Sequence, residues 1–169
     1  MANPVYEFDP VTHITAGALG VPGQRVFYIQ AERGLERVTL LCEKEQVQAL
    51  AEAIDEMAEK LEEEFKLARA PSLAVDEVKM TIKEPVEPLF RVGAMALGYD
   101  ANRDRVLLVA QEALAEDEER DPQEVRLFAT RAQMHALSAY AKDVVGRGRT
   151  PEQRAYQIEA HVRRNGHGE

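Results

Sequence analysis

The side chains best suited to chemistry gather near the end of the chain. His161, Arg163, Arg164, Asn165 and His167 fall within seven residues. Arginine guanidinium groups bind carboxylates and phosphates through paired hydrogen bonds, and a histidine changes charge near neutral pH. Together these residues predict either an enzyme site for a small acidic or phosphorylated ligand or one end of a nucleic-acid surface.

No familiar catalytic or metal motif accompanies this segment. The phosphate loop Gly-x-x-x-x-Gly-Lys-Ser/Thr, the zinc motif His-Glu-x-x-His and the nucleophile motif Gly-x-Ser-x-Gly are absent from the sequence. His161 and His167 have no carboxylate or thiolate at ligand spacing, and Cys42 stands in an apolar stretch typical of a buried side chain. We therefore assign no catalytic residue, metal ligand or cofactor, and the sequence does not decide whether the chain is an enzyme.

Charge is distributed unevenly along the chain. The net charge of −9 over 169 residues disfavours general attraction to nucleic acid or lipid, but residues 145–168 carry five arginines and only two acids. Further cations, Lys79 and Lys83 among them, fall on the strands expected in the second half. The candidate binding residues are Arg91, Arg105, Arg126, Arg147, Arg149, His161, Arg163, Arg164 and Asn165.

Two interpretations of the strand cations are open. If one sheet face is bare, the cations and Phe27, Tyr28 or Tyr99 form a stacking platform for single-stranded nucleic acid. If the two sheets cover each other, the cations line edge strands and discourage aggregation there. The choice depends on which sheet face the fold leaves uncovered.

The elements that must position these residues form a recurring unit. Residues 38–61 read as an apolar strand that turns directly into an amphipathic helix, and residues 125–147 repeat this pattern 87 positions later, with Gln46 matching Gln133. Weaker matches upstream, such as Pro10 with Pro85, extend the similarity towards the start of each unit. The pattern predicts an internal duplication.

The expected elements follow from hydrophobic periodicity. In the second unit, Val78, Met80 and Ile82 alternate with polar residues, which predicts a strand, and Thr130 with Gln133 predicts a capped helix start. Strands are expected at 5–8, 14–19, 25–32, 38–42 and 78–82, and helices at 44–66, 130–146 and from 150 to about 165.

The expected fold is therefore α+β, with two tandem ββββα repeats, antiparallel sheets, pseudo-twofold symmetry and a C-terminal helix. The expected boundaries are 1–69 for the first repeat, 70–77 for a linker, 78–146 for the second repeat and 147–169 for a basic helix and tail. In outline this arrangement is similar to PUR-type modules, which bind single-stranded nucleic acid. That similarity concerns the fold alone.

Several segments resemble a bacterial family of unknown function, the one numbered three thousand and ninety. They are Phe8-Asp9-Pro10, residues 17–20, 25–30 and 46–50, Phe90-Arg91-Val92-Gly93, and 159–167. The resemblance covers nearly the whole chain and implies no established activity. Members of that family carry a cysteine-rich segment of zinc-ribbon type before a closing Asn-Gly, whereas residues 149–169 contain no cysteine here. The resemblance therefore implies no zinc.

These observations lead to a functional expectation. We expect a non-enzymatic, cytoplasmic binding or assembly module that binds a protein partner or a second copy of itself. Single-stranded nucleic-acid binding and an enzyme acting on a small acidic ligand near the tail are the alternatives. No leader peptide and no apolar run of about 18 residues is present, so no membrane association is expected.

Overall fold

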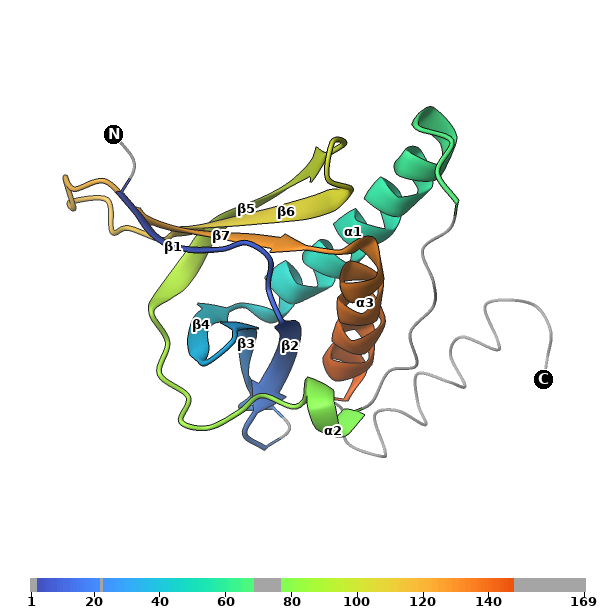
Figure 1. Ribbon diagram of the computed structural model, residues 1–169. Helices are drawn as coiled ribbons and strands as arrows, with labels where there is room; N and C mark the ends of the chain where they lie inside the picture. Colours follow the sequence, from blue (N-terminus) through green and yellow to red (C-terminus); the bar gives the residue numbers. More distant parts are fainter. Residues whose placement is uncertain (1–2, 22, 69–76, 148–169) are drawn as a thin grey trace, which may run out of the picture.

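The computed structural model describes residues 3–21, 23–68 and 77–147, which form an α+β fold (Figure 1). Seven strands form one sheet in the order β1-β7-β6-β5-β4-β3-β2. The strands are β1 (Asn3–Phe8), β2 (His13–Leu19), β3 (Val26–Arg33), β4 (Glu36–Cys42), β5 (Phe90–Asp100), β6 (Arg105–Glu112) and β7 (Gln123–Ala129). The helices are α1 (Lys44–Glu64), α2 (Glu77–Met80) and α3 (Arg131–Gly146).

The prediction of an α+β fold is confirmed, but the sheet is mixed rather than antiparallel. β1 pairs with β7 and β4 pairs with β5 in parallel. A parallel pair needs a long connection between its strands, and both of these pairs have one. The β4–β5 joint consists of two residue pairs, Leu40–Phe90 and Leu41–Arg91. The sheet thus has two parts, β2-β3-β4 and β5-β6-β7-β1, which Figure 1 shows at different levels.

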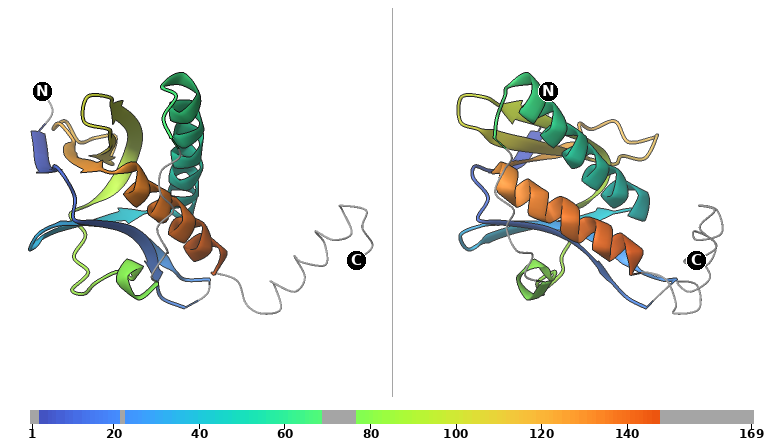
Figure 2. Two further views of the ribbon diagram at one scale, coloured as in Figure 1. Left: turned by 45° about the vertical axis from the view of Figure 1, so that its right-hand side comes forward. Right: turned by 90° about the vertical axis from the view of Figure 1, so that its right-hand side faces the viewer.

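Helices α1 and α3 lie side by side and pack on the same face of the sheet (Figure 2). Each large side chain that is fully buried contributes roughly 1.5–3 kcal/mol to folding. The main helical contributors are Val47, Leu50, Ile54, Leu61, Met134, Leu137 and Val144. None of the helices in the described part combines the length and apolar character that crossing a membrane requires. The helix predicted from residue 150 lies outside the described residues.

Both long helices begin with a glutamine three residues after the cap. The predicted start of α3 is confirmed: Thr130 Oγ1 accepts from the Gln133 amide, and the Thr130 amide donates to Gln133 Oε1 at 2.9 Å. At α1 the Glu43 amide donates to Gln46 Oε1 at 2.8 Å. Each of these bonds satisfies a backbone N–H group that the helix itself leaves unpaired.

The strand predicted at 78–82 is wrong. Residues 77–80 form the short helix α2, and the chain then continues without regular structure to β5. Val78 is 84% exposed, whereas Met80 and Ile82 are buried. The alternating pattern therefore reflects one buried side of a short segment rather than a strand, and the second half contributes three strands instead of four.

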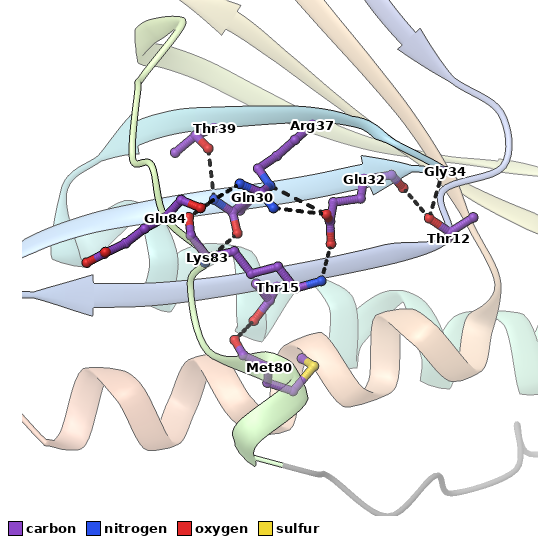
Figure 3. A network of polar contacts seen from close by, with 10 residues as sticks. All are labelled: Thr12, Thr15, Gln30, Glu32, Gly34, Arg37, Thr39, Met80, Lys83 and Glu84. Atoms are coloured by element: carbon purple, nitrogen blue, oxygen red, sulfur yellow. Dashed lines mark hydrogen bonds and ion pairs between the residues drawn. The ribbon is translucent and has the colours of Figure 1, made fainter.

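This segment covers the face of β2-β3-β4 that points away from the helices (Figure 3). Thr15 Oγ1 donates to the Met80 carbonyl at 2.6 Å, and Ile82 packs against Gly17 of β2. Gln30 holds Lys83 through two bonds: its Nε2 donates to the Lys83 carbonyl at 3.0 Å, and its Oε1 accepts from the Lys83 amide at 2.9 Å. A buried glutamine side chain thus takes the place of a neighbouring strand.

We expect Gln30→Leu to lower the free energy of unfolding by about 1–3 kcal/mol, because it leaves the Lys83 backbone and the Thr39 hydroxyl without partners. Urea denaturation followed by circular dichroism measures this change. Gln24→Leu, at an exposed position, is the control and should change the free energy by less than about 0.5 kcal/mol. Equal effects of the two variants would contradict the role given to Gln30.

Candidate functional site

The face of β5, β6 and β7 that points away from α1 and α3 carries no helix or strand in the described part of the chain, and we call it the open face (Figure 1). Side chains alternate along a strand, so the neighbours of buried Val106, Leu108 and Ala110 point to this face. Its apolar members are Ala94, Ala96, Gly98, Leu107, Val109 and Phe128, and its polar members are Arg105, Gln111, Glu124 and Arg126.

The cations on the open face are hydrogen-bonded within the protein. Arg126 Nε bonds Glu124 Oε2 at 2.6 Å, and Gln111 donates to the other oxygen of the same carboxylate at 3.0 Å. These two hydrogen bonds, first that of Gln111 and then that of Arg126, hold the pKa of Glu124 below its ordinary value. Arg105 donates to the backbone carbonyls of residues 103 and 104. The face is therefore apolar at its centre, and the two cations around it already have hydrogen-bond partners within the protein.

Arg103 adds an aromatic contact beside the open face. Its guanidinium carbon lies 4.9 Å from the centre of the Phe128 ring, within the range of a cation–π interaction. The same side chain bonds Asp9 and Asp100, each at 2.9 Å. Phe128 is consequently held in a fixed position, half-buried, at the boundary between β7 and the β5–β6 turn.

Of the four predicted binding residues that the structure describes, two share the open face. Arg105 and Arg126 lie on the open face, on β6 and β7, and both strands have neighbours on each side. The interpretation that these two cations protect edge strands is therefore wrong. The predicted platform of Phe27, Tyr28 or Tyr99 is also wrong for this face, because Phe27 is buried, Tyr28 is on β3 and Tyr99 contacts Phe65, the residue that follows α1.

Arg91 and Arg147 lie elsewhere. Arg91 forms an ion pair of 3.2 Å with Glu43 and lines a cleft of about 540 Å³ at the start of α1, together with Arg25 and Lys44. Arg147 follows α3, where it pairs with Asp143 and stacks on Tyr140. The remaining predicted residues, Arg149, His161, Arg163, Arg164 and Asn165, lie outside the described residues.

A second hollow lies between α1 and α3 and has a volume of about 430 Å³. Its floor is apolar and its rim is charged, the usual composition of a small-ligand site. However, both of its basic residues, Arg131 and Lys142, already have acidic partners: Arg131 bonds Asp104 at 2.8 Å and Lys142 bonds Asp55. Residues lining this groove include Met57, Leu61, Val106, Met134, His135 and Lys142.

Asp55 links the two helices at the edge of this groove. Ser138, on α3, donates to Asp55 Oδ1 at 2.7 Å, and Lys142 binds the other carboxylate oxygen. Burial by itself would raise the pKa of Asp55, but the hydrogen bonds from Lys142 and Ser138 outweigh it and lower the pKa. Both carboxylate oxygens of Asp55 on α1 therefore bind side chains of α3, and the clearest role of this residue is to join the two helices.

The described residues contain no group of three or more His, Cys, Asp or Glu side chains that could hold a metal ion. Cys42 lies on β4 and is buried, and this burial raises the pKa of its thiol to about 12. A thiol with that pKa is protonated at neutral pH and is a weak nucleophile.

The loop between β6 and β7, which its acidic composition predicts to be mobile and solvated, is tied to the sheet. Arg120 forms two bonds to the carboxylate of Glu112, at 2.7 and 2.8 Å, and a third to Glu118 at 3.1 Å. The Gln123 amide also donates to Glu112 at 3.1 Å. This clamp closes the end of the open face where β7 begins.

The apolar members of the open face were missed by sequence reasoning. A signal was available in β7, where Phe128 occupies the same side of the strand as the exposed Arg126, while Val125, Leu127 and Ala129 are buried. An aromatic residue on the polar side of a strand indicates a surface feature rather than core.

We expect Arg120→Ala to raise the pKa of Glu112 from about 2 towards its ordinary value of 4.5, because the hydrogen bond from Arg120 is the main cause of the lowering. In the native protein the clamp stabilises the fold fully above pH 4.5, and this stabilisation is lost as the pH falls towards 2. NMR titration of the Glu112 carboxyl carbon measures the pKa. Arg33→Ala, which breaks a different surface pair, should leave the titration unchanged.

Comparison with known proteins gives one match. No curated protein and no solved structure matches the chain. A family model described as "Protein of unknown function (DUF3090)" matches residues 6–157, which include every described strand from β2 to β7 and all three helices. The chain therefore belongs to the DUF3090 family, as its sequence motifs predicted.

Proposed function

We propose that this chain is a non-enzymatic cytoplasmic binding module that recognises a protein partner through the open face. One observation carries the proposal: the outward side of β5-β6-β7 carries Leu107, Val109 and Phe128, which are half-buried and adjacent in the strand register, while Met80–Glu84 covers the corresponding side of β2-β3-β4. Uncovered apolar patches with a polar border are characteristic of sites where another protein binds.

The chemistry of the border favours a protein over a nucleic acid. A polyanion must recruit cations, but Arg126 is engaged by Glu124, and Arg103 by Asp9 and Asp100. Recruiting these arginines would leave carboxylates facing the phosphates. A protein surface with its own apolar centre can dock on this face without breaking these ion pairs.

We also propose that the two halves of the chain arose by duplication of one binding unit, and the similarity between the halves supports this. The elements β2-β3-β4-α1 and β5-β6-β7-α3 follow in the same order. Gln46 and Gln133, which are 87 residues apart, cap their helices in the same way. Each then donates to a backbone carbonyl of the other half, Gln46 to Val92 at 3.0 Å and Gln133 to Val11 at 3.2 Å.

To test the protein-binding proposal, a photo-crosslinking amino acid replaces Val109 on the open face, and this variant is expressed in the organism that naturally makes the protein. We expect illumination to give a discrete product with another protein, because Val109 lies at the centre of the surface. The matched control carries the crosslinker at Glu52, on the exposed side of α1.

A second variant sharpens this test. Phe128→Ser removes the aromatic ring from the open face and should reduce the yield of the Val109 product several-fold. Identical products from positions 109 and 52, or an unchanged yield with Phe128→Ser, would contradict the proposal.

Single-stranded nucleic-acid binding is the second proposed function, and one contact favours it. The Arg103 guanidinium stacked on Phe128, beside Arg105 and Arg126, resembles the mixture of aromatic rings and cations that such surfaces use. If this function is correct, labelled oligonucleotides bind with an affinity that falls steeply with salt. Arg126→Ala should then weaken binding and reduce the salt slope by about 1. Absence of measurable affinity at low salt would remove this function.

A further inference from the structure

Strand β5 has a long free edge in the interior of the sheet. β6 pairs with it from Val92 to Asp100, but β4 meets it only at Phe90 and Arg91. In a strand, the N–H and C=O groups of alternate residues point to opposite sides. After Arg91, every second residue of β5 therefore points these groups away from β6. In the described part of the chain, the backbone of residues 93–100 receives no hydrogen bond on that side from any strand, helix or side chain.

At the two ends of this edge there are contacts from the side of α1: Gln46 donates to the Val92 carbonyl at 3.0 Å, and the Phe65 ring contacts Tyr99. Between these ends, the edge lacks the features that usually prevent strand addition. Exposed edges are normally protected by charged residues, proline or a covering segment. β1 carries Pro4 and Glu7, and β2 has Met80 and Ile82 packed against it. In contrast, the run from Val92 to Tyr99 contains neither a charged residue nor a proline.

The side chains at this edge are also incompletely buried. Met95 and Leu97 point to the helix side of the sheet, where their cross-strand partners Ala110 and Leu108 are fully buried, yet both remain partly exposed. On the other side stand Ala94, Ala96 and Gly98, which are too small to obstruct an approaching strand. A β-carbon added at Gly98 would meet nothing closer than 4.0 Å.

We propose that the free edge of β5 pairs with β5 of a second copy of this chain, antiparallel and centred on Ala96. In this register, residues directly opposite each other point to the same face. Met95 then faces Leu97 of the other copy, so the partly exposed apolar side chains bury one another. Ala94 faces Gly98 of the other copy, so small residues meet on the opposite side.

Charge at the two ends of β5 matches the same register. β5 begins near Arg91 and ends at Asp100, and the residues between Arg91 and Asp100 carry no charge. In the register centred on Ala96, Asp100 faces Val92 of the other copy, so each Arg91 lies one position away from an Asp100 of opposite charge. Arg91 also pairs with Glu43, and Asp100 with Arg103, within each copy. A strand of identical sequence therefore complements this edge in size, in burial and in charge.

This inference goes beyond the proposed function, because it uses the edge of β5 and does not require a partner on the open face. In strand pairing of this kind, the two copies bind each other through backbone hydrogen bonds between their exposed sheet edges. The two proposals can therefore fail separately. A monomeric protein whose open face still crosslinks to a partner would overturn only the self-association.

Analytical ultracentrifugation of the full chain over a wide range of concentrations tests the proposal. The wild type should show a monomer–dimer equilibrium. Ala96→Lys places two ammonium groups opposite each other at the centre of the pairing and should raise the dimer Kd at least about tenfold. Phe128→Ser, two strands away from the edge, should leave the Kd unchanged, and circular dichroism checks that both variants are folded.

A disulfide trap tests the register. Directly opposite residues of an antiparallel pair have Cα atoms about 4.5–5.5 Å apart, which is within the range that a disulfide spans. Ala96→Cys should therefore form a covalent dimer on mild oxidation, while Gln48→Cys, exposed on α1, should not. Cys42 is buried and does not compete. A wild type that stays monomeric, or a dimer that neither Ala96 variant affects, would overturn the proposal.

Discussion

The weakest link in the sheet determines how the rest of the protein is built. β4 and β5 share two residue pairs, so the hydrogen bonds of the sheet alone cannot hold its two parts together. Three other features do so. β1 pairs with β7 and continues directly into β2, the segment after α2 lies on β2 and β3 and continues into β5, and α3 packs against both α1 and β2. Each of these contacts joins residues from opposite halves of the chain.

The same short joint explains why surface is available for binding. Because β4 leaves β5 after Arg91, no strand among the described residues pairs with the remainder of β5 on that side, and its apolar side chains stay partly exposed. The outward sides of the two parts of the sheet also differ in how far they are covered. The segment that follows α2 shields the outward side of β2-β3-β4, and no described segment does the same for β5-β6-β7.

Local features of this fold are readable from the sequence, whereas long-range pairing is not. The Thr130–Gln133 cap and the apolar stripe of α1 depend on residues three or four positions apart, and both are confirmed. The parallel partner of β1 depends on residues more than 100 positions away, for which no local pattern exists. The strand predicted at 78–82 failed because two buried residues separated by one exposed residue fit a short helix and loop as well as a strand.

The candidate site shows the same division. The sequence identified Arg105 and Arg126 but not their partners Glu124 and Asp104, which decide whether these cations are available to a ligand. It also placed the stacking aromatics on the wrong face, because the alternation of β3 and β5 does not reveal which side the helices occupy. Phe128 could be recognised only from its position among the buried residues of β7.

The exchange of segments between the halves has a topological consequence. β1 comes before α1 in the chain, yet it pairs with β7 in the part of the sheet formed by the second half. Met80–Glu84 comes after α1, yet it packs on β2 and β3 in the part formed by the first half. A protease cut between α1 and α2 would therefore leave two fragments that are still joined by the β1–β7 pairing and by the hydrogen bonds of Met80–Glu84 to β2 and β3.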